Sequence, residues 1–105
     1  MAQPTFRQMR TFLTVVEAGS VSTAARLLNL TQPAASQQLR ELERCLRVRL
    51  LDRAGGRSIP TAAGTALLEP ARRAQVAIED AERFVRELAE HGILVLSEQP
   101  IQSGK

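Results

Sequence analysis

The apolar residues near the start of the chain recur at the spacing of an α-helix. A stripe at i, i+3, i+7 and i+10 is formed by Phe6, Met9, Leu13 and Val16. This pattern predicts an amphipathic helix that buries one face. Thr5 and Gln8 have the spacing of a capping box at its start, and Gly19 is placed to end it.

Two further amphipathic helices are predicted after Gly19. The apolar stripe of the first comprises Val21, Ala24, Ala25 and Leu28. Either Ser20 or Ser22 caps this helix, and Asn29–Leu30 forms a tight break after it. Thr31 then caps a third helix, which has Pro33 in its first turn, where a missing N–H costs nothing. The expected buried face of this third helix comprises Ala35, Leu39, Leu42 and Leu46.

The pattern changes to short extended segments after the third helix. Val48–Arg53 is compatible with a β-strand, Ala54–Arg57 has the composition of a turn, and Ser58–Pro60 can return as a second strand. Such a hairpin directly after a helix-turn-helix is called a wing. We therefore expect a mainly α fold in which residues 1–60 form a winged helix-turn-helix domain with three helices and a two-stranded wing.

The last predicted element is a long helix that Thr61 caps and Gly92 ends. Its apolar residues repeat like the a and d positions of heptads, at Leu67, Ala71, Ala74, Ile78, Ala81, Val85 and Leu88. A helix from Ala62 to Glu90 is roughly 40 Å long, with Pro70 expected to bend it locally. A domain of about 60 residues is too small to pack against the whole length of this helix. Residues 61–91 are therefore expected to pair two chains through the apolar seam. Packing of part of the seam on the chain's own first helix is the competing interpretation.

Charge is unevenly distributed along the 105 residues. Residues 1–60 carry nine arginines and four acidic residues, a net +5, whereas residues 61–105 carry five basic and seven acidic residues, a net −2. A basic N-terminal part favours a module that binds a polyanion. The single Cys45 excludes an intrachain disulfide, the start lacks a signal peptide, and the longest apolar run, Ile93–Leu96, is too short to span a membrane. We therefore expect a cytoplasmic protein.

The polar face of the third predicted helix has the chemistry of base recognition. Gln32, Ser36 and Arg40 recur at i, i+4 and i+8, with Gln37 and Arg44 beside them. A helix with short polar side chains at its N-terminal end fits the DNA major groove, where Gln can bridge adenine N6 and N7 and Arg can bind guanine or a phosphate. A solvated face is the competing interpretation of the same pattern.

The segment Gly19–Glu43 resembles the N-terminal signature of LysR-type transcriptional regulators. The resemblance rests on the Ala24–Ala25 pair, the Thr31–Ser36 run and the Gln38-Leu39-x-x-Leu42-Glu43 pattern. Further along, Arg49–Arg53 is similar to the family's strand entering the wing, and Thr61-x-x-Gly64 is similar to the start of its linker helix. The resemblance spans roughly residues 5–90.

This resemblance implies a regulator that binds interrupted inverted repeats in double-stranded DNA as a dimer or tetramer. Matching positions imply DNA contacts from Gln32, Pro33 and Ser36. The next recognition position, often Arg in the family, is Gln37 here, which should shift base preference. Arg57 is the matching basic residue of the wing and Arg53 is the second candidate. With the residues argued above, the expected DNA-binding set is Thr31, Gln32, Pro33, Ser36, Gln37, Arg40, Arg53 and Arg57.

The family's C-terminal effector domain does not fit in the remaining residues. Only fifteen residues follow Glu90, and Ile93–Leu96 stands where that domain's first strand would begin. We expect residues 92–105 to be a short tail and the chain to be either a truncated form or a naturally short relative. No small-molecule effector site, and no cofactor, is then expected within it.

The remaining chemistry-bearing residues have ordinary structural interpretations. His91 is expected to interact with a helix C-terminus rather than a metal, and Cys45 to pack rather than act as a redox switch. Glu79, Asp80 and Glu82 are expected to form a solvated patch. One His and one Cys cannot assemble a catalytic group, so an enzyme is not expected. A non-specific architectural DNA-binding protein, and an interaction module that traps full-length regulators as heterodimers, remain open alternatives.

Overall fold

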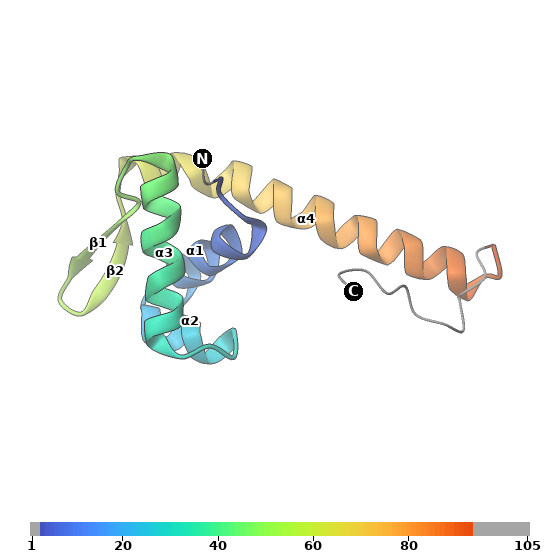
Figure 1. Ribbon diagram of the computed structural model, residues 1–105, viewed down its shortest axis with the longest axis horizontal. Coiled ribbons are helices and arrows are strands. Elements are labelled where there is room, and N and C mark those ends of the chain that lie inside the picture. Colours follow the sequence, from blue (N-terminus) through green and yellow to red (C-terminus); the bar gives the residue numbers. More distant parts are fainter. Residues whose placement is uncertain (1–2, 94–105) are drawn as a thin grey trace. The chain divides into compact units, whose positions relative to one another are not determined.

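The computed structural model describes residues 3–93, which contain four helices and one two-stranded sheet (Figure 1). In chain order these are α1 Phe6–Ala18, α2 Val21–Leu27, α3 Gln32–Leu46, β1 Leu51–Ala54, β2 Arg57–Pro60 and α4 Ala62–Glu90. The chain divides into two compact units within α4, the first ending at Gln75 and the second beginning at Val76. The expected mainly α winged helix-turn-helix followed by a long helix is confirmed. The expected strand at Ile93–Leu96 lies outside the described residues except for Ile93.

Each of the first three helices begins at a side chain that caps it. Thr5 Oγ1 accepts from the Gln8 N–H at 3.1 Å and the Gln8 side chain accepts from the Thr5 N–H, which completes the capping box. Ser20, and not Ser22, caps α2 by accepting from the Thr23 N–H at 3.2 Å. The N-cap of α3 is Thr31, as expected, and its hydroxyl accepts from the Ala34 N–H. These caps satisfy backbone donors that the helices leave free.

A Schellman motif makes the turn between α2 and α3. Asn29 has a φ of 62°, and the Leu30 N–H donates to the Ala25 carbonyl at 2.8 Å. Asn is one of the few non-glycine residues that adopt this left-handed conformation readily. The motif ends at Leu30, and the next residue, Thr31, is already the N-cap of α3. The two helices are therefore joined by the short turn that is typical of a helix-turn-helix.

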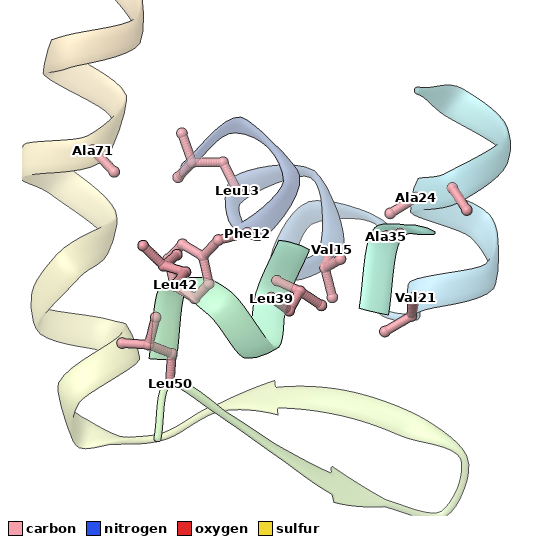
Figure 2. Packing of buried hydrophobic residues seen from close by; sticks show 11 residues of the cluster. Phe12, Leu13, Val15, Val21, Ala24, Ala35, Leu39, Leu42, Leu50 and Ala71 are labelled. Carbon is pink, nitrogen blue, oxygen red and sulfur yellow. The ribbon is translucent and has the colours of Figure 1, made fainter. Parts of the chain in front are cut away.

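The core of the first unit lies where α1, α2, α3 and the start of α4 meet (Figure 2). Its largest fully buried side chains include Phe12, Leu42, Leu50 and Val15. The predicted α3 face is confirmed at Ala35, Leu39 and Leu42, whereas Leu46 is 37% exposed in the last turn of the helix. Since a large side chain that reaches several elements excludes most water, Phe12 and Leu42 dominate this small core.

The apolar stripe predicted for α1 is confirmed at Leu13, which is 3% exposed, and Met9 and Val16 pack against the core, but the prediction was wrong for Phe6. Phe6 is 38% exposed, whereas Phe12 and Val15 are fully buried together with the polar residues Gln8 and Thr11. The polar pair is buried because it bonds to α3: Thr11 Oγ1 donates to Gln38 Oε1, and Gln8 Nε2 donates to Glu41 Oε1 at 3.4 Å. Hydropathy alone could not include these residues in the buried face, since their burial depends on partners from another helix.

The wing is an antiparallel hairpin whose register pairs Leu51 with Pro60 and Ala54 with Arg57. Its two loop residues, Gly55 and Gly56, both have positive φ, as a type I′ turn requires. The first strand begins at Leu51 rather than at the predicted Val48. This difference arises because the Val48 N–H still bonds to the Glu43 carbonyl of the α3 terminus.

Helix α4 begins by packing on the wing and the core. The Thr61 N–H donates to the Leu50 carbonyl at 2.9 Å, and the Thr61 hydroxyl accepts from the Gly64 N–H and donates to the Arg49 carbonyl. Gly64 is buried so closely that a Cβ there would lie 2.2 Å from the Leu50 carbonyl oxygen. Further along, Ala71 is 4% exposed within the core. The first two turns and the Ala71 face are therefore part of the domain.

The second unit contains the remainder of α4, and its described residues have no buried side chain. The helix continues to Glu90 and ends at Gly92, which has a φ of 74°. A Schellman motif closes it, because the Ile93 N–H donates to the Leu88 carbonyl at 2.9 Å. Among residues 3–93, no helix is long and apolar enough to cross a bilayer.

Candidate nucleic-acid interface

The N-terminal half of α3 presents an exposed polar face opposite the core. Thr31, Gln32 and Pro33 are exposed at the start of the helix, and Ser36 is half-buried one turn later. Ala35 and Leu39 point into the core, so the packing fixes which side of the helix faces outward. Gln32 and Ser36 are brought together on this outer side, as the i, i+4 spacing predicted. Short polar side chains on a rigid helix are suited to contacting base edges in the major groove.

A chain of side-chain hydrogen bonds organises the next turn. Arg40 Nη2 donates to Gln37 Oε1 at 3.1 Å, and Gln37 Nε2 donates to Glu41 Oε2 at 2.9 Å. Gln37 is exposed, and its amide therefore links a cation to a carboxylate on the surface of α3. The arrangement holds the Arg40 guanidinium against the helix and leaves donors that can bind a phosphate or a guanine.

The wing lies beside α3 (Figure 1). Side chains of the two elements line a groove between them. The groove has a volume of about 150 Å³ and is lined by Ser36 and Arg40 from α3 and by Arg53 and Ser58 from the wing. Arg49 also lines it, although sequence reasoning did not place this residue among the DNA contacts. The three arginines at positions 47, 49 and 53 were the signal that could have identified it. The structure thus brings predicted residues of the helix and wing into one basic surface.

Arg57 lies at a different point of the wing from Arg53. A Cβ at Gly19 would be 3.3 Å from Arg57 Nη2, so the exposed guanidinium lies over the junction between α1 and α2. The Ser58 N–H donates to the Gly19 carbonyl at 2.9 Å and fixes the strand there. Gly19 has a φ of 86°, which a side-chain-bearing residue rarely adopts. This glycine therefore both ends α1 and leaves room for the wing arginine.

Glu43 fixes the connection between α3 and the wing. Its Oε2 atom accepts from the Leu50 N–H at 2.7 Å and from the Leu51 N–H at 3.2 Å. Hydrogen bonds to a charged acceptor are about twice as strong as neutral ones. Since Leu50 is 2% exposed, these bonds also satisfy a backbone donor that water cannot reach. Glu43 is therefore a positioning residue for the wing, a role that the sequence did not indicate.

The predicted seam on α4 is divided between the two units. In the first unit, Ala71 is buried, Leu67 packs against the core and Ala74 is exposed. In the second unit, Ile78 is 37% and Val85 is 53% exposed, Ala81 is exposed and Leu88 is half-buried. Leu67 and Ala71 of the seam thus pack in or against the chain's own core. The seam residues from Ile78 onward are not buried by any described residue.

The single His, the single Cys and the acidic patch of α4 lie at or near the protein surface. The exposed His91 has its Nδ1 atom 2.7 Å from the Glu87 carbonyl oxygen at the end of α4. Cys45 is half-buried on α3. Asp80 forms an ion pair with Arg83 on the same helix. Between residues 3 and 93, no group of three or more His, Cys, Asp or Glu residues could hold a metal ion.

The three helices, the tight α2–α3 turn and the adjoining hairpin define a winged helix-turn-helix domain of the kind that binds DNA. The family model described as bacterial regulatory helix-turn-helix protein, lysR family, matches residues 6–65. The chain therefore belongs to the LysR family of bacterial regulatory helix-turn-helix proteins.

Two related transcriptional regulators agree with this assignment. The regulator CbbR of Rhizobium meliloti (strain 1021) is 43% identical over 83 residues, which cover 76% of this chain and 26% of CbbR. A transcriptional regulator in the ibpB-leuC intergenic region of Azotobacter vinelandii is 44% identical over 80 residues, covering 76% of this chain and 56% of that protein. The chain thus spans about a quarter and about half of the lengths of these two relatives.

A solved structure supports the fold directly. The CbnR DBD in complex with DNA has a TM-score of 0.73 to this chain and 39% sequence identity, over 81% of this chain and 98% of that one. The similarity therefore includes nearly the whole of a domain crystallised on DNA.

Proposed function

We propose that this domain binds a specific double-stranded DNA sequence as the DNA-binding and pairing part of a transcription regulator. The observation that carries the proposal is the exposed polar face of α3 beside a wing rich in arginine, with both elements fixed by one core. In this proposal α3 lies in the major groove of the bound duplex, and the wing contacts the minor groove or the phosphate backbone. The structure of the related CbnR DBD on DNA supports this interpretation.

The residues have distinct roles in this proposal. Gln32, Ser36 and Gln37 read base edges, while Thr31 and Pro33 contact the duplex at the start of α3. Arg40, Arg53 and Arg57 bind phosphates or the minor groove. Base contacts supply specificity, whereas phosphate contacts supply affinity that depends on salt. We also infer a cytoplasmic location, where a regulator meets its DNA, and we assign residues 3–93 no small-molecule effector site.

The experiment that tests the proposal begins with selection of bound duplexes from a random pool. A specific regulator should prefer the selected duplex over random DNA by about 10³–10⁷-fold. Gln32→Ala should lose about 1–3 kcal/mol of discrimination at one base pair, whereas Arg57→Ala should weaken all duplexes and lower the salt slope by about 1. Equal affinity of the wild type for every duplex would contradict sequence-specific regulation and favour an architectural role.

We further propose that two chains pair through the second-unit part of the seam, so that a dimer or tetramer binds an interrupted inverted repeat. Ile78, Ala81 and Val85 are exposed there and recur at heptad spacing. Ile78→Glu should convert dimers to monomers in analytical ultracentrifugation, because a charge would be buried in the seam. Val76→Glu, which adds the same charge at an exposed position on the opposite side of the helix from the seam, is the control. A dimer that survives Ile78→Glu would contradict pairing through this face.

A further inference from the structure

A chain of hydrogen bonds connects the start of α1 to the exposed polar face of α3. Gln8 Oε1 accepts from the Thr5 N–H at 3.1 Å, and Gln8 Nε2 donates to Glu41 Oε1 at 3.4 Å. The other oxygen of Glu41 accepts from Gln37 Nε2 at 2.9 Å, and Arg40 Nη2 donates to Gln37 Oε1 at 3.1 Å. We propose that Glu41, held by Gln8, is a positioning residue that fixes the amide of Gln37 and thereby determines which base Gln37 accepts. The inference rests on the proposed DNA-binding function.

The direction of these bonds is set by a backbone group of the α1 cap. An N–H can only donate, so the Thr5 N–H holds Gln8 Oε1 and leaves the Gln8 NH2 group to face α3. Gln8 is 8% exposed and completes the capping box, so its amide has little freedom to turn over. The residue of α3 that meets this amide must therefore accept a hydrogen bond.

Glu41 lies between two donors and has the chemistry to satisfy both. An ionised carboxylate accepts at each of its oxygens, whereas a glutamine would offer one oxygen and one NH2 group in the same two places. Hydrogen bonds to a charged acceptor are also about twice as strong as neutral ones. Glu41 therefore holds the nitrogen of the Gln37 amide, while the guanidinium of Arg40, which can only donate, meets its oxygen.

The orientation of this amide matters because it decides the order in which a donor and an acceptor meet the base. In the major groove adenine presents an acceptor at N7 and a donor at N6, whereas guanine presents acceptors at N7 and O6. A glutamine whose amide turns over freely presents either order and fits more than one base edge. The amide of Gln37 presents one order only. Both oxygens of Glu41 are engaged within the protein, so its effect on the base is exerted through Gln37.

The test compares the affinity of each variant for the selected duplex and for duplexes with single base-pair changes. Gln37→Ala identifies the base pair that Gln37 reads. Glu41→Gln should lower discrimination at that base pair about tenfold and leave the other base pairs unaffected. Gln8→Glu should lower the same discrimination, because glutamate keeps the capping-box acceptor but presents no donor to Glu41. Glu41→Gln combined with Gln37→Ala should lose no more discrimination than Gln37→Ala alone.

The two substitutions also separate amide orientation from charge. Glu41→Gln removes a negative charge and Gln8→Glu adds one, so their electrostatic effects on affinity for all duplexes have opposite signs. Loss of the amide orientation lowers discrimination in both. Glu17→Gln is the control, since it removes an exposed acidic charge from α1, and it should leave discrimination unchanged. Thermal unfolding is measured for every variant, and binding is compared below the midpoint.

Several outcomes would overturn the inference. If Gln37→Ala changes a base preference and Glu41→Gln does not, Glu41 does not position the amide. If Gln37→Ala changes no base preference, or if Glu41→Gln still lowers discrimination in the Gln37→Ala background, Glu41 does not act through Gln37. Unchanged discrimination in a folded Gln8→Glu protein would contradict the part assigned to Gln8. A wild type with no preferred duplex would instead refute the proposed function, which keeps the two failures distinct.

Discussion

The close contact of Gly64 with the chain before the wing makes the substitution Gly64→Ala an informative perturbation. Gly64 lies in the first turn of α4, and an added Cβ would be 2.2 Å from the Leu50 carbonyl oxygen and 3.2 Å from the Pro60 Cβ. Real Cβ atoms essentially never approach another heavy atom within 3.0 Å, so the backbone at Leu50 would have to move by nearly 1 Å. The methyl group cannot turn aside, because it is attached directly to the helix backbone.

Two effects of opposite sign decide the change in stability. Alanine favours the helix by at most about 1 kcal/mol relative to glycine. Against this, overpacking a close contact costs about 1–3 kcal/mol, and moving the Leu50 carbonyl weakens its 2.9 Å bond from the Thr61 N–H, worth about 0.5–1.5 kcal/mol. Glu43 holds the Leu50 N–H from the other side, so the segment has little freedom to shift. We therefore expect a net loss of about 2 kcal/mol.

Thermal unfolding followed by circular dichroism measures this loss. For a domain of this size, about 2 kcal/mol corresponds to a fall in Tm of roughly 10 °C. Thr65→Ala, at the neighbouring exposed position of the same turn, is the matched control and should leave the Tm unchanged or slightly raised. A Gly64→Ala protein as stable as the wild type would show that the contact with Leu50 is not restrictive, and helix propensity would then be the larger effect.

Substitutions at three further positions test other parts of the structure. Leu42→Ala, at a fully buried side chain, should lower the free energy of unfolding in urea by about 2–5 kcal/mol; a loss below 1 kcal/mol would contradict its central place in the core. Glu43→Ala should cost about 3 kcal/mol and Glu43→Gln about half of that, because glutamine retains an acceptor for the Leu50 N–H; equal losses would exclude the hydrogen bonds as the cause. Gly19→Ala should cost about 1–2 kcal/mol through its positive φ, and an unchanged midpoint would contradict that strain.

Local signals in the sequence were sufficient for most of the secondary structure. Capping side chains, a proline at the start of α3 and a pair of glycines in the wing act over a few residues, so their spacing predicted the elements without knowledge of the fold. The outer face of α3 was predictable for the same reason, because Ala35 and Leu39 mark the opposite side. Resemblance to the LysR family then gave these elements a common function.

Contacts between distant segments could not be derived in this way. The burial of Gln8 and Thr11 depends on side chains of α3 that are about thirty residues away in the chain, and neither residue belongs to the predicted apolar stripe. The same applies to Glu43, whose carboxylate bonds to backbone groups seven and eight residues later. A polar residue is buried only where a partner satisfies it, and the fold alone provides that partner.

The sequence by itself determined that this protein has three short helices, a hairpin and a long helix, and that the outer face of the third helix carries polar side chains. Only the tertiary structure decided that Arg49 lines the groove between α3 and the wing, that Leu67 and Ala71 belong to the core, and that Gly64 must remain small. Periodicity records which residues share a face of one element. Which face meets which other element depends on packing, and packing is a property of the whole domain.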